Sequence, residues 1–153
     1  MAKSGIHIDL KGFEKQLAEL NKKSEEIDKI ASKAIKDSAK IVEAELKAEA
    51  VASAVPDSII NEMHTKVSNK DDRYTADIGW ELGSYSSKNP SVGYIAMFLN
   101  YGAVRGGAEN RKTRRGQNRG KLQARQFIER AKKAAKPKIK RQMKKIIEEV
   151  NEN

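Results

Sequence analysis

The chain contains no cysteine, few aromatic residues and no long apolar segment. Without cysteine it can form no disulfide bond, no cysteine-ligated zinc site and no thiol nucleophile, and this composition fits synthesis in a reducing cytosol. The longest apolar run, residues 94–99, is far shorter than the roughly 20 residues needed to cross a bilayer. Residues 1–10 carry no apolar signal core. These absences predict a soluble protein with no visible export signal.

Because aromatic residues make up only 5% of the 153 residues, the core must consist largely of Ile, Leu, Val and Ala. The length fits one domain, and a domain of this size can bury about 70% of the surface of its unfolded chain. The sequence contains no repeat and no second hydrophobic block. We therefore expect residues 1–153 to form a single domain.

Charge is abundant but unevenly distributed along the chain, whose net charge is +10. Residues 1–102 hold 14 Lys and Arg against 16 Asp and Glu, whereas residues 103–153 hold 17 against 5, so the two parts carry −2 and +12. A positive field confined to the last third of the chain predicts an anionic partner: nucleic acid, an acidic protein surface or a lipid head group.

Hydrophobic periodicity predicts a helix near each end of the chain. Over residues 10–52, apolar or small side chains recur at steps of three and four, and no Pro or Gly lies between Phe13 and Val55. Residues 123–151 carry a second stripe of this kind. Pro137 lies within this stripe, where it removes one backbone hydrogen bond and should kink the helix.

Alternation of apolar and polar residues predicts strands between the two helices. The alternation covers residues 63–67 and 74–80, and the polar cluster at 68–72 is the expected hairpin turn. Residues 92–101 form a third apolar element, for which we expect a strand, with a short helix as the alternative because it contains good helix formers. The order of long helix, antiparallel strands, basic loop and helix is an α+β architecture.

Residues 103–122 are predicted to form a mobile basic loop, because four glycines and almost no apolar side chain leave nothing to bury. Against one acid, Glu109, the basic residues of this loop are Arg105, Arg111, Lys112, Arg114, Arg115, Arg119 and Lys121. The planar fork of arginine suits phosphate, and no aromatic residue lies between the arginines to stack on bases. Two interpretations remain open: phosphate contact without sequence specificity, or a loop that becomes ordered against another protein chain.

Residues that could carry out catalysis or bind a metal are few. His7 and His64 lie in different elements, and neither has an acid–base partner at a recognisable motif spacing. Glu43, Glu45 and Glu49 lie on a lysine-rich helix, where solvation or pairing along the helix is expected. The glycines match no phosphate-loop pattern. We therefore expect no catalytic residue, no metal site and no cofactor, and interpret the chain as an assembly or binding module.

Two further groups of side chains have structural interpretations. The nine basic residues between positions 130 and 145 lie opposite an apolar stripe and are expected to form a solvated face. Tyr94, Phe98, Tyr101 and Trp80 hold much of the aromatic content. Most of them are expected in the core, with at least one at a subunit contact.

Two short segments carry a family resemblance. Residues 94–102 read YIAMFLNYG, and residues 124–131, after the basic loop, read ARQFIERA. This arrangement resembles the tail-component family of long-tailed bacteriophages, whose members show Y-A-x-F-x-E-x-G, then a loop, then A-R-P-F-[LI]-x-x-A. Residues 8–13, followed by a long charged helix, are also similar to that family. Asn100 stands where an acid is usual in the family, and Gln126 stands where proline is usual.

The resemblance implies a structural virion protein of a phage or prophage, made in the host cytoplasm and located at the neck, where head and tail join. Such head–tail connector or tail-completion proteins assemble as rings, often hexameric, on other neck and tail proteins, and have neither cofactor nor membrane partner. The motif residues that the resemblance marks as subunit-interface or family positions are Tyr94, Phe98, Tyr101, Gly102, Ala124, Arg125 and Phe127.

In such a ring the basic loops would face genomic DNA in the lumen, where contact without sequence specificity is what is needed. The main alternative is a nonspecific nucleic-acid-binding protein that uses the arginine-rich loop and has no virion role. An enzyme such as a nuclease would need an acidic metal cluster, and Asp71 and Asp72 alone are a thin basis for one.

Overall fold

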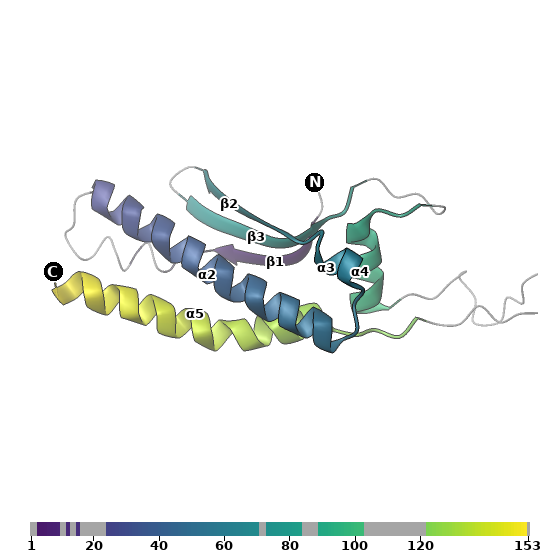
Figure 1. Cartoon of the computed structure of the whole chain (residues 1–153). Helices are drawn as coiled ribbons and strands as arrows, with labels where there is room; N and C mark the ends of the chain where they lie inside the picture. The colour runs from purple at the N-terminus through teal and green to yellow at the C-terminus, as the bar shows by residue number, and fades with distance from the viewer. Residues whose placement is uncertain are drawn as a thin grey trace, which may run out of the picture.

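A three-stranded antiparallel sheet lies on a pair of antiparallel helices in the computed structural model of the chain (Figure 1). The structure describes residues 3–9, 12, 15, 24–70, 73–83, 89–102 and 122–152. The elements, in chain order, are β1 (Lys3–Asp9), α2 (Ser24–Ala52), α3 (Asp57–Ile60), β2 (His64–Lys70), β3 (Arg73–Glu81), α4 (Val92–Tyr101) and α5 (Phe127–Glu152). The predicted α+β architecture is confirmed.

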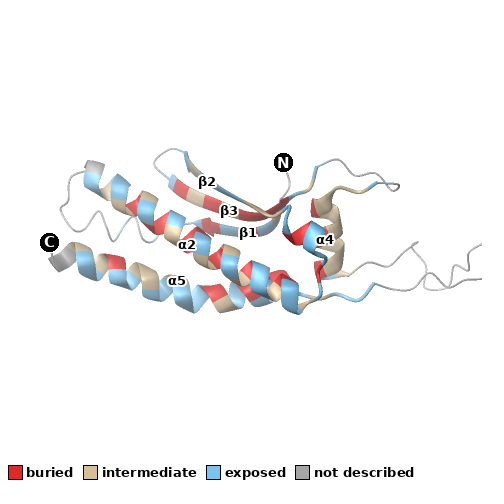
Figure 2. Ribbon diagram, in the orientation of Figure 1, coloured by how far each residue is buried: buried red, intermediate tan, exposed pale blue. Residues whose placement is uncertain are grey.

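The sheet has the order β1-β3-β2, so β3 is its central strand. Apolar side chains alternate along β3 at Tyr74, Ala76, Ile78 and Trp80, all of which are buried. Because successive side chains point to opposite faces, this alternation turns one face of the sheet toward α2 and leaves the other face polar. Figure 2 shows the buried residues concentrated on β3 and on the side of α2 that faces the sheet.

The two predicted strands are confirmed, but the hairpin turn is shorter than expected. The predicted turn began at Ser68, whereas the ladder continues to the pair Lys70↔Arg73. Ser68 and Asn69 therefore belong to β2, and the hydroxyls of Ser68 and Thr75 hydrogen-bond across the ladder at 2.9 Å. Positions 71 and 72 lie outside the described residues.

β1 was not predicted, although it pairs with β3 along its whole length. Its sequence, KSGIHID, offers only two apolar residues, Ile6 and Ile8, and both are buried toward the helices. Two alternating positions are too few to indicate a strand by periodicity alone. Pairing with the central strand β3 holds β1 in place, and the sequence does not reveal this pairing.

The long N-terminal helix is confirmed over Ser24–Ala52. Buried residues follow the helical spacing through Ala31, Ile35, Val42 and Leu46. Of the earlier part of the prediction, residues 12 and 15 are described and helical, and the rest lies outside the described residues. The stripe also places Ser38 at 0% exposure, and within the described part of the chain its hydroxyl has no hydrogen-bond partner.

The expectation of a strand over residues 92–101 was wrong, because Val92–Tyr101 forms helix α4. Its buried residues, Gly93, Ala96 and Asn100, recur at steps of three and four, as a helix requires. At Gly93 the helix backbone lies directly against the end of β3. A β-carbon on this residue would lie 2.1 Å from the carbonyl oxygen of Glu81. A larger residue there would push the helix away from the sheet.

Helix α5 runs back along α2, which is its main packing partner. It begins at Phe127 rather than at the predicted position 123 and continues through the exposed Pro137. Two ion pairs join the helices, from Lys138 to Glu45 and from Arg130 to Glu49. None of the helices in the described part of the chain is long and apolar enough to cross a membrane.

The base of the basic segment, a candidate partner and nucleic-acid interface

The residues that flank the basic segment, positions 103–121, meet at one place in the fold. The predicted contact residues Arg105, Arg111, Lys112, Arg114, Arg115, Arg119 and Lys121 all lie outside the described residues. The residues that flank the segment are described. An ideal β-carbon on Gly102 would lie 2.7 Å from the carbonyl oxygen of Leu122, so the outgoing and returning chains are in direct contact.

Gly102 makes this close approach possible. Its φ is +78°, a conformation that residues with a side chain rarely adopt. A β-carbon would also come within 3.0 Å of the amide nitrogen of Ala124. The Gly102 N–H donates to the carbonyl of Phe98 at 2.8 Å and ends α4. A glycine is therefore required here both by the backbone turn and by the chain that passes beside it.

Backbone hydrogen bonds then join the returning chain to the end of α4. The N–H of Arg125 donates to the carbonyl of Leu99, and the N–H of Gln126 donates to the carbonyl of Asn100, each at 3.0 Å. The last carbonyls of a helix lack partners within the helix. The returning chain supplies two of these missing donors, so the start of α5 is fixed to the end of α4.

The side chain of Asn100 completes this junction from within the core, where it has 0% exposure. Its carbonyl oxygen accepts the N–H of Ile128 at 2.9 Å, which satisfies a free amide in the first turn of α5. Its amide nitrogen donates to both carboxylate oxygens of Glu129, at 2.9 and 3.2 Å. An acid, usual here in the family that the sequence resembles, would instead place a second carboxylate beside Glu129.

Gln126 has a φ of +51°, which ends the extended segment and turns the chain into α5. Proline, the residue usual at this motif position, holds φ near about −65° and has no N–H to donate. Proline could neither adopt this φ nor donate the hydrogen bond that Gln126 makes to the carbonyl of Asn100. The backbone conformation and the hydrogen bond at this position therefore explain why glutamine and not proline stands here.

Two arginines connect the start of α5 to the end of α2. Arg125 donates through one guanidinium nitrogen to the carbonyls of Ser53 and Ala54, at 3.0 and 2.8 Å. Arg130 forms an ion pair with Glu49 at 2.7 Å and also donates to the hydroxyl of Ser53. The last turn of α2 contains no basic residue of its own. The two guanidinium groups therefore supply the positive charge that a helix C-terminus favours.

Phe127 anchors the junction in the core. It is fully buried and meets Trp80 edge to face, with ring centroids 6.0 Å apart and an interplanar angle of 89°. The indole N–H of Trp80 donates to the carbonyl of Ile59 at 2.6 Å. The core interpretation of Trp80 is confirmed. We call this junction, formed by Asn100, Gly102, Leu122 and residues 124–129, the clamp.

An aromatic stripe lies on α4 beside the clamp. Tyr94, Phe98 and Tyr101 follow the i, i+4, i+7 spacing of one helix face, and the rings of Tyr94 and Phe98 are 6.2 Å apart. Tyr101 is 60% exposed. Partial burial and the neighbouring Glu129 carboxylate raise the pKa of Tyr101. The structure therefore brings the predicted motif residues together, with Tyr101 at the surface and Ala124 exposed next to it.

The histidines have partners that sequence spacing did not indicate. His7 Nδ1 lies 2.7 Å from Asp77 Oδ1, and His64 Nε2 lies 3.9 Å from Glu81. Both pairs are on the polar face of the sheet and join residues of neighbouring strands, which is why only the strand register reveals them. Within the described ranges, no three His, Asp or Glu side chains are placed to hold a metal ion.

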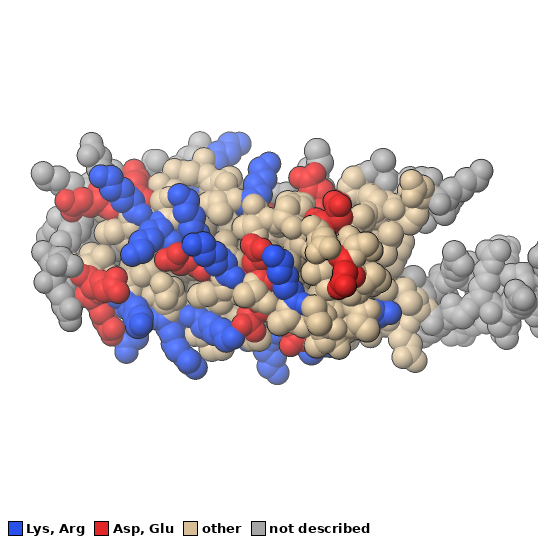
Figure 3. Space-filling view, viewed as in Figure 1, with Lys and Arg blue, Asp and Glu red and all other residues tan. Residues whose placement is uncertain are grey.

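The helix carboxylates also have partners. Glu43 accepts from Lys47 along the same helix, as expected, at 2.6 Å, and from Thr65 of β2 at 2.9 Å. Glu45 and Glu49 instead pair across the helix interface with α5. On the face in Figure 3, Lys and Arg are interspersed with Asp and Glu along the helices. These carboxylates join elements of the fold.

Comparison with protein families gives a match. The family model described as "Bacteriophage HK97-gp10, putative tail-component" matches residues 11–102, more than half of the chain. The matched region runs through α2, the hairpin and α4 and ends at the glycine of the clamp. Comparison with curated proteins gives no match, and neither does comparison with solved structures. The chain belongs to this HK97-gp10-like family of bacteriophage tail components, and it is a structural protein of the virion.

Proposed function

We propose that the protein acts at the neck of a tailed bacteriophage or prophage, as a head–tail connector or tail-completion protein that assembles into a closed ring. Its role is mechanical and not catalytic. The observation that carries the proposal is the clamp. It holds Gly102 against Leu122, so the segment with seven basic residues begins and ends at one fixed place on each subunit.

A ring makes use of this arrangement. Identical subunits related by rotation would present their basic segments at the same level, around a common axis. Phosphate contacts made by arginine carry no sequence information, which suits a lumen through which a whole genome passes. The positive charge of residues 103–153, +12, is of the right sign for this role.

A ring also needs two different faces that fit each other, because its interfaces are heterologous. The aromatic stripe of α4 is our candidate for one of these faces. Tyrosine and phenylalanine are enriched at protein interfaces, and Tyr101 is already exposed beside the clamp. The long helix α2 is the candidate for the other face, since its side away from the sheet is exposed over most of its length (Figure 2).

The proposal is tested in the phage or prophage that encodes the chain. Removal of the gene should yield filled heads and separate tails, and supplying the protein in trans should restore joined particles. Imaging of intact particles should show the chain in the neck as a ring. Particles that join normally without the protein, or a neck that contains no copy of it, would exclude the proposed role.

A second candidate is a nonspecific nucleic-acid-binding protein without a virion position, favoured by the charge asymmetry between the two parts of the chain. The two functions differ in their partners. The alternative predicts DNA binding by the isolated protein and no loss of particle joining when the gene is removed.

A further inference from the structure

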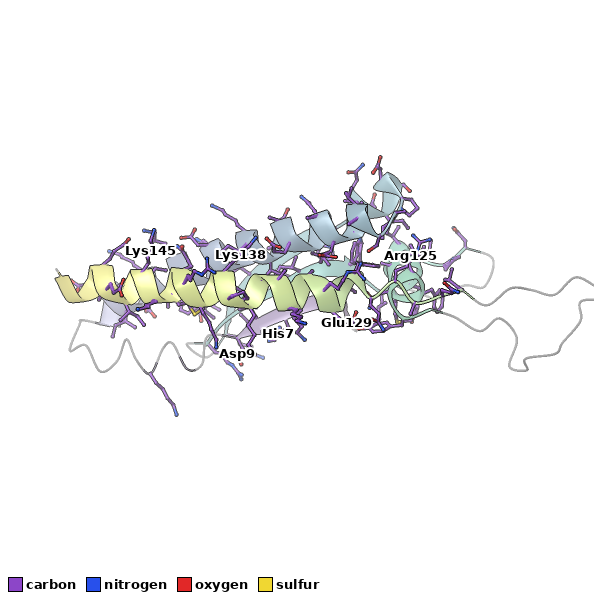
Figure 4. The ribbon with its side chains drawn as sticks, turned by 90° about the horizontal axis from the view of Figure 1, so that it is seen from below. His7, Asp9, Arg125, Glu129, Lys138 and Lys145 are labelled. Atoms are coloured by element: carbon purple, nitrogen blue, oxygen red, sulfur yellow. The ribbon has the colours of Figure 1, made fainter. Side chains whose placement is uncertain are left out.

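A groove of about 670 Å³ runs between β1 and the N-terminal half of α5. On the β1 side it is lined by Ile6, His7, Ile8 and Asp9. Figure 4 shows α5 passing in front of β1, with His7 and Asp9 beside the helix. The groove lies away from the clamp's aromatic stripe and is made by other elements.

The strand that forms one wall is an edge strand. β1 pairs with β3 on one side, and no other described strand pairs with it. Four consecutive residues of β1 line the groove, although their side chains point alternately to the two faces of the sheet. The groove therefore follows the backbone edge of β1. Such an edge presents N–H and C=O groups that can pair with another strand.

The opposite wall is basic. Lys132, Lys133, Lys136 and Lys140 line the groove, and steps of four place three of them on one stripe of α5. No described carboxylate lies within ion-pair distance of these four lysines. This separates them from the basic residues on the α2 side of the helix, which pair with Glu45 and Glu49.

The acidic groups that do border the groove are already engaged. Asp9 forms an ion pair with Arg73, and Glu129 accepts the amide of Asn100. The remaining titratable group on this wall, His7, is bonded to Asp77. The four lysines thus outnumber the two carboxylates that border the groove, of which Asp9 is already paired with Arg73, and this balance favours an anionic occupant.

The floor of the groove is apolar, and this favours an acidic peptide over a nucleic acid as the anionic occupant. It is formed by Ile6, Ile8, Val42, Ala135 and Ile139, and Ile139 is partly exposed. A strand alternates its side chains and can place apolar groups on such a floor while acidic groups reach the lysines. A nucleic-acid backbone repeats a phosphate at every nucleotide and has no apolar side chains that alternate with its charges. The apolar floor, basic wall and unpaired strand edge together match an acidic peptide in extended conformation.

We propose that this groove binds an extended acidic segment of another protein chain, which adds to the sheet as a fourth strand next to β1. Main-chain hydrogen bonds to β1 would provide affinity, and the lysines of α5 would select acidic side chains. The inference depends on neither the ring nor the neck position, because it concerns a surface of the folded subunit.

The test uses the full-length protein and a defined probe, a fluorescein-labelled ten-residue peptide of alternating Glu and Val, followed by fluorescence anisotropy. The triple variant K132Q/K136Q/K140Q is expected to weaken binding by roughly tenfold or more, as the loss of several charged contacts implies. The matched control R141Q/K144Q/K145Q removes three charges from the same helix outside the groove and should change affinity by less than about twofold. A Lys/Val peptide should not bind.

Strand addition has its own readout. Binding of the Glu/Val peptide should slow amide hydrogen exchange in β1 and leave exchange in β2, the other edge strand, unchanged. Circular dichroism should show both triple variants folded, since exposed substitutions cost within about 0.5 kcal/mol. If the groove variant does not fold, K136Q alone carries the comparison, with K144Q as its control.

Several outcomes would overturn the proposal. Equal weakening by both triple variants would mean that the peptide responds only to net charge. Peptide binding without slower exchange in β1 would exclude strand addition. A 20-base-pair duplex that binds through the groove lysines while the peptide does not would identify a phosphate site. Self-association lost only in the groove variant, without peptide binding, would identify a second copy of the chain as the occupant.

Discussion

The amide of Asn100 on α4 donates to both carboxylate oxygens of Glu129 on α5, at 3.2 and 2.9 Å. Through the same side chain, the carbonyl accepts the N–H of Ile128. A single buried residue thus satisfies a donor and an acceptor of the helix that follows the basic segment. The attachment of that segment depends on a polar group in the core and not only on packing.

Replacing Asn100 with Asp is expected to destabilise the fold by about 1–3 kcal/mol at pH 7, because a buried donor is lost and two carboxylates face each other. Protonation of one carboxyl would relieve the repulsion, so the loss should shrink as pH falls from 7 toward 4. Urea unfolding across this range measures it. The Asn100→Ala variant is the control, since it also loses the donor to Glu129, together with the acceptor for the Ile128 N–H, but adds no charge. An equal pH dependence in both variants would contradict the explanation.

Gln126 provides a test of the backbone at the clamp. Because its φ is +51°, Gln126→Gly should raise the free energy of unfolding by up to about 1 kcal/mol. Gln126→Pro should lower it by about 3 kcal/mol or more, since proline can neither adopt this φ nor donate to Asn100. Thermal and urea unfolding of the two variants give the comparison. A proline variant as stable as the wild type would mean that the chain enters α5 by another route.

Parts of this fold could be predicted from the sequence and parts could not, for physical reasons. The hairpin was recognisable because Ile78 and its neighbours alternate on a half-buried central strand. β1 contributes only Ile6 and Ile8 to the core, which is too weak a signal. Residues 92–101 were misassigned as a strand because an apolar run of this length suits either element, and the decision depends on which small residues face the sheet.

The candidate site also has parts that the sequence predicted and parts that it did not. Motif residues such as Gly102 and Arg125 were identified by resemblance, but their roles depend on partners distant in sequence. Arg125 bonds to carbonyls about 70 residues away, and His7 and Asp77 are likewise 70 positions apart. No local pattern encodes such contacts, because they follow from strand register and helix packing. The predicted contacts of the seven basic residues remain predictions.

Ser38 gives a test of the core. Its hydroxyl is buried without a hydrogen-bond partner in the described part of the structure. Ser38→Ala removes an unsatisfied group and should raise the free energy of unfolding by about 1 kcal/mol. Ser32→Ala, on the same helix but partly exposed, corrects for the higher helix propensity of alanine. If the two substitutions stabilise equally, the hydroxyl of Ser38 has a partner in solution.

Glu43 should make stability depend on pH on the acid side. Hydrogen bonds from Lys47 and Thr65 lower the pKa of Glu43 in the folded state. A group with a lowered pKa stabilises the fold above its unfolded pKa, and this contribution disappears as pH falls through the folded value. Because the pair is partly exposed, Glu43→Gln should cost only about 0.5 kcal/mol at pH 7. The difference from wild type should shrink as pH falls through the lowered pKa of folded Glu43; a difference that persists once Glu43 is protonated would have another origin.

The basic segment contains five arginines: Arg105, Arg111, Arg114, Arg115 and Arg119. If they contact phosphate, binding of the isolated protein or its ring to duplex DNA should ignore base sequence and weaken steeply with salt. Each lost contact should reduce the log–log salt slope by about one. The variant with all five changed to Ser should fold with nearly wild-type stability, because the clamp residues on either side of the segment, among them Gly102, Leu122 and Glu129, are untouched.

Particle assembly by the five-Ser variant separates charge from docking. A variant that still joins heads to tails and binds DNA with an unchanged salt slope would show that the arginines contact neither DNA nor partner. A variant that folds and binds DNA normally but no longer joins heads to tails would mean that the segment docks on an acidic protein face. Substituting Lys for the five arginines is the discriminating control. Lysine keeps the charge but not the planar fork, so a lumen that needs only positive charge should accept it, whereas a site built on bidentate contacts should not.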